Sequence, residues 1–401
     1  MLFTTRRLVP VLVLLLCCWI GWKAYGYFFD TSVPTFTVSG LEEGGYCSGD
    51  AVCLISGDDG YKVESISVWL DERPVLSKFK INKKKFEYSL PIPTKTIANG
   101  KHMLKIEVTD ASYNKNNAMQ QRSFFVDNTP LQAAFIRPDL DYRVFQGRTL
   151  HIQFQVNKEI QDASIKMFSR SYPCYAEVQG VPIYECFVPI ECEEQPSEYP
   201  FVIQIHDKVG NEVTLENKFQ VLPYPFKKQQ LTLAQDKVKA EKEIGIPQEK
   251  FEQLMEQLVA QSPAEKLWHG TFYVPINMTK VSCDYGTTRT TQEKGCYMHK
   301  ALDVLGAPRS VVWAPQDGVV VVKDRFVQSG NTVVIDHGCG IFTLLFHLEN
   351  FADVHVGDKI KRGNPVGTIG KTGYATGYHL HWEMRINNVA TDPLQWTKSG
   401  F

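Results

Sequence analysis

Hydrophobic and polar residues alternate along much of the first half of the chain. One such alternating set is Ile66, Val68 and Leu70, and another is Leu104, Ile106 and Val108. Both sets are bounded by turns rich in Asp, Asn and Gly, and the text around Ile205–Asn211 repeats the ending of the first unit. Period-two alternation with turns every 8 to 12 residues is typical of a small β-sandwich. The pattern therefore predicts a mainly β chain with two β-units, over residues 33–130 and 131–224.

The period changes after Pro225. Residues Gln229–Glu243 are charged and helix-forming, and Gly245 ends them. The next segment places apolar residues at helical spacing: Phe251, Leu254, Met255, Leu258 and Val259. These residues form one apolar stripe, which most often packs on a neighbouring domain. We therefore expect a helical linker over residues 225–263, and we hypothesise that it restricts access to the groove of the domain that follows.

An uncharged apolar run, Leu8–Trp22, follows two arginines near the N-terminus. As a helix this run spans only about 22 Å, but extension to Phe29 reaches the length of a bilayer core if Lys23 extends its ammonium to the interface. The pattern predicts a signal anchor over residues 1–32, with the arginines on the cytoplasmic side and the rest of the chain exported.

Two alternatives to the anchor remain open. A cleaved signal peptide is one, although no small-x-small site follows the run. A lipid anchor at Cys17 or Cys18 is the other, although Leu16 stands where a small residue would be expected.

Composition narrows the class of protein. The chain has 401 residues, enough for about two to three domains. Its 43 Lys+Arg and 44 Asp+Glu give a net charge of −1, which argues against a nucleic-acid binder because phosphate contacts need clustered positive charge. With 43% apolar residues the chain has ample material for packed cores.

Cysteine usage also favours export, since cysteines occur in every region, as disulfides in an oxidising compartment do. Beyond the anchor they are Cys47, Cys53, Cys174, Cys186, Cys192, Cys283, Cys296 and Cys339. Short spacing favours the pairs Cys47–Cys53 and Cys283–Cys296. A cysteine zinc site is the alternative, but the sequence has no C-x-x-C motif.

Candidate chemistry is concentrated between His299 and His381, where six of the ten histidines lie. His299 and Asp303 form a His-x-x-x-Asp pair, and His379 and His381 form a His-x-His pair. Residues two apart on a strand point to the same face, so the fold could direct all four groups into one cavity. Two imidazoles and a carboxylate around an open position are the ligands of a catalytic zinc ion, which can activate an amide for hydrolysis. Either pair alone is a weak signal.

The residues around these two pairs make the signal for a metal site stronger. Residues 264–401 resemble the lysostaphin/LytM-type zinc endopeptidases of the M23 family, through "HKALD", "VVWAPQDGVVV" and "GNTVVIDHGCGIFTLLFHLEN…GKTGYATGYHLHWEMRINN". The resemblance implies a LytM-type β-sheet catalytic domain with one zinc ion bound by His299, Asp303 and His381. It also implies that His347 and His379 are catalytic.

For other residues of this domain, the sequence indicates structural or supporting roles. His337 and His355 are expected to be structural. Glu383 follows the His-x-His pair and is a candidate to orient a ligand, although an ordinary strand carboxylate is an equal alternative. Ala301 replaces a glycine common in the family, which matters only if the backbone there needs positive φ. Phe346 stands where the family commonly has tyrosine.

The β-units resemble bacterial immunoglobulin-like modules through "NGKHMLKIEVTDASYNKNN…FFVDNTP". Together the resemblances imply a zinc metalloendopeptidase that hydrolyses the peptide cross-links of bacterial peptidoglycan. It would be a single-pass protein of the bacterial inner membrane with its catalytic domain in the periplasm, and its immunoglobulin-like units would serve as spacers or contact a protein partner. The alternatives are a non-catalytic regulator of cell-wall amidases and a wall-binding module.

Overall fold

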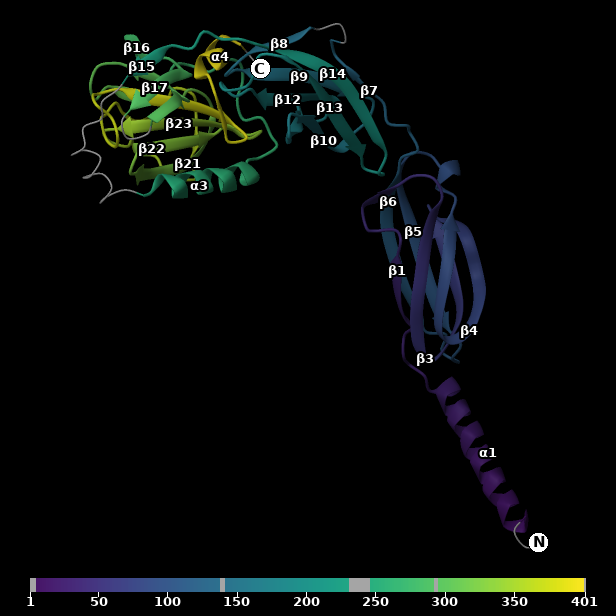
Figure 1. Ribbon diagram of the computed structural model, residues 1–401. Coiled ribbons are helices and arrows are strands. Elements are labelled where there is room, and N and C mark those ends of the chain that lie inside the picture. The colour runs from purple at the N-terminus through teal and green to yellow at the C-terminus, as the bar shows by residue number, and fades with distance from the viewer. Residues whose placement is uncertain (1–4, 138–140, 231–245, 292–294, 400–401) are drawn as a thin grey trace. The chain divides into compact units, whose positions relative to one another are not determined.

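The computed structural model describes residues 5–137, 141–230, 246–291 and 295–399. The chain divides into two compact units, one of residues 1–130 and 208–211 and one of residues 131–207 and 212–401. Strands dominate both units and the N-terminal segment is an apolar helix (Figure 1), so the prediction of a mainly β chain is confirmed.

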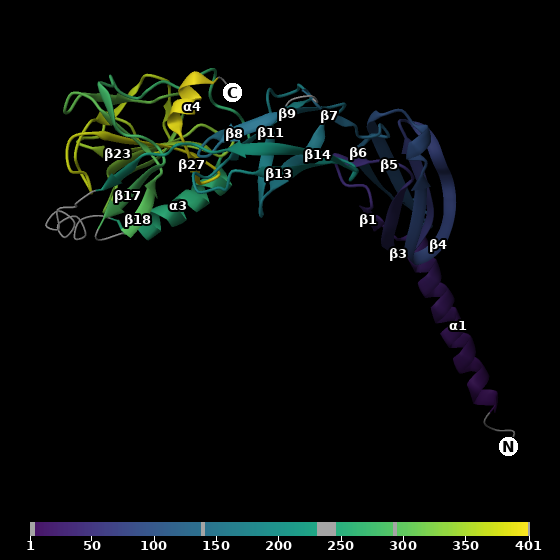
Figure 2. The same cartoon turned by 45° about the horizontal axis from the view of Figure 1, so that its top comes forward.

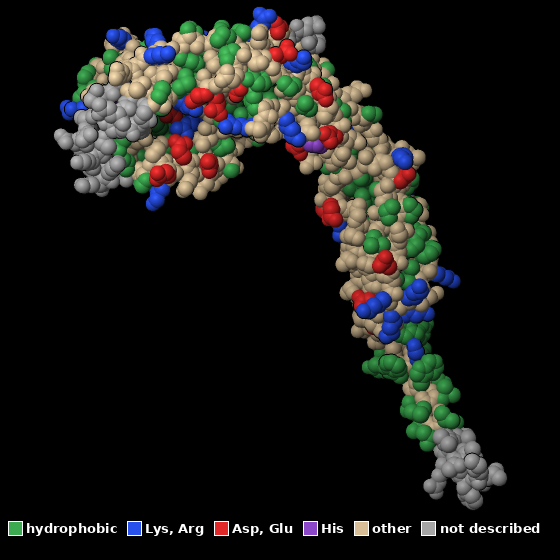
Figure 3. All heavy atoms as spheres, in the orientation of Figure 1, with side chains coloured by type: hydrophobic (Ala, Val, Ile, Leu, Met, Phe, Trp, Pro, Cys, Tyr) green, Lys and Arg blue, Asp and Glu red, His purple; other side chains and the backbone are tan. Residues whose placement is uncertain are grey.

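Helix α1 (Thr5–Phe28) carries the apolar run predicted from the sequence. Its segment Pro10–Phe28 is long and apolar enough to cross a membrane, a test that a signal sequence also passes. Leu12, Leu14 and Trp22 are more than half exposed. Hydrophobic side chains cover the described part of this helix in Figure 3.

The first unit contains β-domain 1, a six-stranded sheet. Its strands are β1 (Thr35–Ser39), β2 (Gly45–Cys47), β3 (Ala51–Leu70), β4 (Arg73–Ile92), β5 (Gly100–Asp110) and β6 (Asn117–Val126). The sheet order is β1-β3-β5-β6-β2, with β4 paired to β3. Alternate residues of β5 are buried, as the period-two pattern predicts, and Ile66, Val68, Leu104 and Ile106 are in the core.

The second unit begins with β-domain 2, whose eight strands run in the order β7-β9-β12-β11-β10-β13-β14-β8. They are β7 (Ala133–Phe135), β8 (Tyr142–Phe145), β9 (Thr149–Val156), β10 (Ile160–Met167), β11 (Arg170–Ala176), β12 (Ile183–Pro189), β13 (Glu198–Asp207) and β14 (Glu212–Leu222). The first half of β11 pairs with β10 and its second half pairs with β12, so this strand joins the two halves of the domain.

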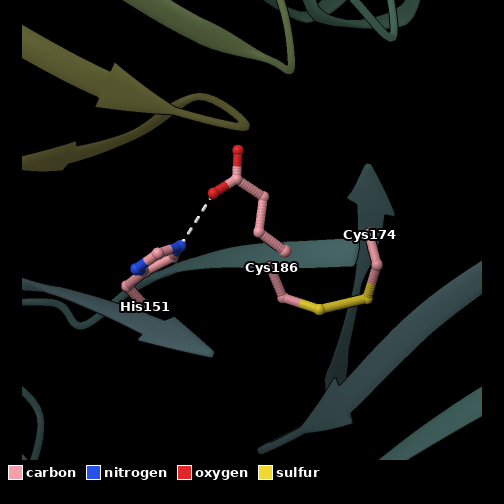
Figure 4. Close-up of a disulfide and its surroundings, with 4 residues drawn as sticks. His151, Cys174 and Cys186 are labelled. Carbon is pink, nitrogen blue, oxygen red and sulfur yellow. Dashed lines mark hydrogen bonds and ion pairs between the residues drawn. A yellow bond between two sulfur atoms is a disulfide. The ribbon is translucent and has the colours of Figure 1, made fainter. Parts of the chain in front are cut away.

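A disulfide links Cys174 and Cys186, which face each other across β11 and β12 (Figure 4). The predicted pairs Cys47–Cys53 and Cys283–Cys296 are wrong, because all four are free thiols. Strands β5 and β6 separate the strands of Cys47 and Cys53, and Cys283 and Cys296 lie in different sheets. Spacing along the chain does not reveal this separation.

The C-terminal domain is built on an eight-stranded sheet. Its strands are β16 (Lys280–Cys283), β19 (Leu302–Leu305), β21 (Gly318–Phe326), β22 (Gly330–Asp336), β23 (Ile341–Leu348), β24 (Lys359–Ile360), β26 (Leu380–Ile386) and β27 (Val389–Thr391). The order is β16-β19-β26-β23-β22-β21-β24, with β27 on β26. Two smaller sheets pair β15 (Lys228–Gln230) with β17 (Thr287–Thr291) and β18 (Gly295–His299), and β20 (Val311–Trp313) with β25 (Pro365–Thr368).

The linker contributes one helix and one strand to this domain. Helix α3 (Gln248–Gln261) packs its apolar stripe on β21, β22 and β23, with Phe251 and Met255 fully buried (Figures 1 and 2). The predicted helix over Gln229–Glu243 is wrong at its start, since Gln229 and Gln230 belong to β15, where backbone pairing with β17 overrides helix propensity. The remainder, residues 231–243, lies outside the described residues.

β-domain 2 and the C-terminal domain share a core. Phe187 of β12 packs with Trp268 and with Trp396 of helix α4 (Pro393–Lys398), at ring-centroid distances of 5.7 Å in both cases. Gln395 accepts a hydrogen bond from the Thr149 amide at 2.6 Å and donates to the Thr149 carbonyl at 2.8 Å. On the same side of β-domain 2, His151 contacts the buried carboxylate of Glu185 at 2.9 Å (Figure 4).

Candidate metal centre

Strand register brings the predicted ligands together. Asp303 on β19 lies directly opposite His381 on β26, so their side chains share a face of the sheet. His299 ends β18 and reaches the same point. The His381 Nδ1 lies 2.9 Å from the Asp303 Oδ1, and the His299 Nε2 lies 3.2 Å from each of these two atoms. All three residues are buried or nearly so, and their ligand atoms converge on one point.

This triangle fits a zinc ion. With bonds of about 2.0 Å, two ligand atoms of a tetrahedral zinc site lie roughly 3.3 Å apart. The three distances here, 2.9 to 3.2 Å, are close to that value. Two imidazole nitrogens and one carboxylate oxygen are also the donors of catalytic zinc sites, which leave a coordination position open.

Cys283 is a neighbour of this cluster, because its Sγ lies within 4.8 Å of ligand atoms of His299 and Asp303. Burial raises the pKa of the Cys283 thiol, so the group is protonated at neutral pH, whereas metals bind the thiolate. The thiol lies 3.7 Å from the carbonyl of Asp284. We therefore take the donors to be the two histidines and the aspartate.

Charged groups surround the three ligands. The outer oxygen of Asp303, Oδ2, accepts a hydrogen bond from the Arg289 guanidinium at 2.5 Å. Burial acts to raise the pKa of Asp303, but hydrogen bonds from His299 and His381 outweigh it and hold this pKa well below its usual range. The carboxylate therefore stays ionised, as a metal ligand must.

His381 is fixed on its other side by a chain of ion pairs. Its Nε2 lies 3.0 Å from the Glu383 Oε1, and the Glu383 Oε2 accepts from the Arg385 Nε at 2.7 Å. Arg385 also binds the carboxylate of Glu252 on helix α3. A carboxylate that accepts from the second nitrogen of a ligating histidine fixes its orientation and tautomer. Glu383 is thus positioned to orient His381, the role for which it was a candidate from the sequence.

Two further histidines lie beside the ligands, and each has one nitrogen committed to the backbone. The His347 Nδ1 donates to the Thr372 carbonyl at 2.8 Å, and the His379 Nδ1 donates to the Gly377 carbonyl at 2.9 Å. Each ring therefore carries its proton on Nδ1 and presents an Nε2 lone pair. The His379 Nε2 is 3.8 Å from the Asp303 Oδ1. The centroids of the His347 and His379 rings are 4.9 Å apart.

Burial sets the protonation state of these two histidines. Burial is the largest cause of the lowered pKa of His379. Burial and the nearby imidazoles together hold the pKa of His347 well below 6.5. Both rings are neutral at neutral pH and can accept a proton. His347 has a φ of +63°, a left-handed conformation that is uncommon outside glycine and that often marks functional sites.

The cluster opens into a cleft of about 560 Å³. Phe346 forms part of its wall, and its ring stacks on the His381 ring at 5.0 Å between centroids and 5° between planes. The linker also reaches the cleft, through Gln229 of β15 and through Gln248 and Glu252 of α3. Tyr374 and Tyr378 add aromatic surface beside the catalytic histidine candidates.

The structure brings together all five residues singled out from the sequence: His299, Asp303, His347, His379 and His381. It places His337 elsewhere, fully buried between the Asp317 carbonyl and the Thr343 hydroxyl, and leaves His355 exposed in a loop. Ala301 is not among the residues with positive φ, so its replacement of glycine costs no strain. Sequence reasoning did not find Arg289, Arg385 or Glu252, because an isolated Arg or Glu at these positions carries no local signal.

Residues 297–393 match the sequence profile of Peptidase family M23. DD-carboxypeptidase/endopeptidase Mpg of Neisseria meningitidis serogroup B is 32% identical over 120 residues, which are 30% of this chain and 27% of that protein. Peptidoglycan DD-endopeptidase ShyC of Vibrio cholerae is also 32% identical over 120 residues, 30% of this chain and 28% of that protein.

Among solved structures, the catalytic domain of the antimicrobial peptidase lysostaphin from Staphylococcus simulans aligns with 25% identity and a TM-score of 0.25, over 36% of this chain and 97% of that one. The chain spans about a quarter of the length of the two curated relatives. The predicted resemblance to the M23 family is confirmed over residues 297–393.

Proposed function

We propose that this chain, which carries a Peptidase family M23 domain at residues 297–393, is a zinc-dependent endopeptidase that hydrolyses the peptide cross-links of bacterial peptidoglycan. The two relatives compared above are named as DD-carboxypeptidase/endopeptidase and as peptidoglycan DD-endopeptidase, and this supports the substrate class.

One observation carries the proposal. Three donor atoms of His299, Asp303 and His381 converge to within 3.2 Å of one another, at the base of a cleft that also holds two histidines with unprotonated Nε2 atoms. A purely structural metal site is closed by protein ligands, whereas this one has three protein donors beside a cleft of about 560 Å³.

The residues around the metal would divide the chemistry of amide hydrolysis. The three donors would hold a zinc ion, which would supply Lewis-acid activation of the scissile carbonyl. His379, neutral and with its Nε2 toward the cluster, accepts a proton from the attacking water and can return it to the leaving amine. His347 lies 4.9 Å from the His379 ring and offers a second Nε2 for the same proton. Asp303 stays ionised because hydrogen bonds from His299 and His381 lower its pKa, and Arg289 holds its outer oxygen.

The rest of the chain is proposed to deliver this domain to its substrate. In this proposal α1 is a single-pass anchor in the inner membrane, and the catalytic domain lies in the periplasm. The β-units over residues 33–130 and 131–224 would be spacers or docking surfaces for a protein partner, residues 225–263 the linker, and residues 264–401 the peptidase. Exposed apolar side chains along Pro10–Phe28 support the anchor.

The linker is proposed to restrict access to the cleft. Gln229 and Gln248 line the cleft from two separate elements, β15 and α3, so the linker forms part of its wall. A substrate as large as a cross-linked muropeptide would have to pass these side chains.

The test uses full-length protein in detergent on cross-linked peptidoglycan sacculi, with and without chelator, beside His381→Ala. The proposal expects new amino termini and loss of cross-linked muropeptides, both abolished by chelator and by the substitution. Zinc-loaded protein that binds sacculi without releasing termini would instead identify a wall-binding module. Zinc-loaded protein that neither binds nor cuts, but stimulates an added amidase, would identify a regulator.

A further inference from the structure

Three carboxylates gather where the anchor helix meets β-domain 1, far from the metal centre in sequence. Asp30 follows helix α1, Asp59 lies in the bend of β3, and Asp110 ends β5. Each offers one oxygen to a cluster in which all three oxygens lie within 4.8 Å of one another. Two oxygens that bind one calcium ion can lie up to about 5 Å apart, since each bond is roughly 2.4 Å.

Two carboxylate oxygens of this cluster lack a hydrogen-bond partner within the described part of the chain. Asp59 is only 8% exposed, and its Oδ2 is buried without a partner, as is the Oδ2 of Asp30. The other oxygen of Asp59 accepts from the amides of Tyr61 at 2.9 Å and Lys62 at 2.7 Å, so the carboxylate is held in place with one oxygen free. An ionised oxygen buried without a partner costs several kcal/mol, and a cation bound between these carboxylates would offset that cost.

The neighbouring lysines are engaged by other groups. Lys84 donates to the carbonyl of Gly60 at 2.8 Å, and Lys115 pairs with Glu64 at 2.8 Å. Burial, together with the charges of Asp30 and Asp110, raises the pKa of Asp59. The three carboxylates thus repel one another, and none of them forms an ion pair with a lysine or arginine among the described residues.

β-domain 2 provides an internal comparison. Asp110 pairs with Val63 after the bend of β3, and Asp207 pairs with Ile160 after the corresponding turn between β9 and β10. In β-domain 2 that turn carries Lys158, whose Nζ is 2.5 Å from the Asp207 Oδ2 and neutralises it. In β-domain 1 the residues before Val63 lie within strand β3, at a register shift between Asp58 and Val63, and they include Asp59. At this place β-domain 2 has the ammonium of Lys158, whereas β-domain 1 has the additional carboxylate of Asp59.

We propose that Asp30, Asp59 and Asp110 bind a calcium ion that fixes the end of the anchor helix to β-domain 1. Carboxylate oxygens are the ligands that this hard cation prefers, and a net charge of −3 is matched by no lysine or arginine of the cluster. The ion would replace the role that Lys158 has in β-domain 2. The site is independent of the proposed peptidase activity.

Further contacts already join these three segments. The carbonyl of Asp30 accepts from the side-chain amides of Asn114 at 2.8 Å and Asn116 at 3.1 Å. Asn116 also donates to the Asp110 Oδ2 at 2.8 Å. Calcium would therefore stabilise a junction that is preorganised by the loop after β5.

The experiment uses full-length protein in detergent, stripped with EGTA and then titrated with calcium by calorimetry, together with Asp59→Asn and Asp58→Asn. Asp58 is exposed and adjacent, so it is the matched control. We expect wild type and Asp58→Asn to bind calcium, with a thermal transition raised by roughly 5 °C at saturation, and Asp59→Asn to lose both effects. Calcium binding should persist in His381→Ala, which separates this site from the metal centre.

The variants also distinguish a calcium site from a merely structural carboxyl. In EGTA, Asp59→Asn should unfold at or above the temperature of wild type, because asparagine keeps the oxygen that accepts from Tyr61 and Lys62 but removes one of three repelling charges. Two results would overturn the proposal: no calcium binding by wild type, in which case Asp59 is simply protonated, or equal binding by Asp59→Asn.

Discussion

Glu252 of helix α3 binds Arg385 of strand β26 with both carboxylate oxygens. The Oε2 accepts from Nη1 at 2.7 Å and the Oε1 from Nη2 at 3.3 Å. Because Arg385 binds Glu383 and Glu383 binds His381, a linker residue is connected to a proposed metal ligand through two charged side chains. The linker helix is thus part of the support of the metal centre as well as of its wall.

Substitution of Glu252 should weaken metal binding. Removal of a direct partner of a ligand costs about 10- to 100-fold in metal affinity, so Glu252→Gln, one step further out, is expected to cost roughly 3- to 10-fold. Competition with a chromophoric chelator measures this. Glu256→Gln, exposed one turn later on the same helix, is the control. Equal affinities for the two variants would mean that the ion pair only attaches the helix.

Substitutions of His347 and His381 should differ in their effect on zinc binding. His347→Ala is expected to retain zinc, because its ring is not among the three converging donors, and to lose turnover by about 10²- to 10⁴-fold. His381→Ala is expected to lose both zinc and turnover. Metal content by atomic absorption, together with release of amino termini from sacculi, separates the two effects. Loss of zinc from His347→Ala would instead make His347 a ligand.

Replacement of Gln229 by alanine should make the cleft more accessible to substrate. Gln229 lines the cleft from β15, whereas its neighbour Gln230 is exposed, as alternation along a strand requires. If the linker restricts access, Gln229→Ala raises turnover of cross-linked sacculi several-fold with zinc affinity unchanged, and Gln230→Ala has no effect. The access hypothesis fails if both variants match wild type.

Acid should destabilise the C-terminal domain through His337. Burial lowers the pKa of this imidazole to about 4, and the folded domain therefore resists a proton that the unfolded chain binds at about 6.5. The free energy of unfolding should fall by roughly 3 kcal/mol as the pH drops from 6.5 to 4, and this loss is complete below both pKa values.

Denaturant unfolding at several pH values in the His381→Ala background measures this slope without metal release. The additional substitution His337→Gln should flatten the slope, and substitution of the exposed His355 should leave it unchanged. A slope that His337→Gln does not alter would assign the acid sensitivity to other groups.

The strands and the proposed ligand cluster could be predicted from the sequence for the same physical reason. Alternation at Leu104, Ile106 and Val108 reflects one buried face, and His379 and His381, on either side of the first residue of β26, line the same cleft. Such local periods are visible without knowledge of the fold. The stripe of α3 was visible for the same reason, and Phe251 and Met255 are its buried members.

Pairings between distant segments could not be predicted in this way. Cys174 and Cys186 form the disulfide because β11 and β12 are neighbours, whereas the equally short spacing of Cys283 and Cys296 joins strands of different sheets. Glu252 and Arg385 are 133 residues apart, and nothing local in either position indicates that they meet. Spacing reports which residues share an element, and only the fold reports which elements are adjacent.

The shared core of Phe187, Trp268 and Trp396 has a practical consequence for anyone who studies the peptidase domain in isolation. A fragment that begins at residue 264 would leave two tryptophans and Phe272 without the aromatic ring that covers them. The exposed apolar patch would favour aggregation of the fragment, and the hydrogen bonds of Gln395 to Thr149 would be lost as well. Fragments that begin before β7 should be better behaved, and these two domains are expected to unfold in a single cooperative step.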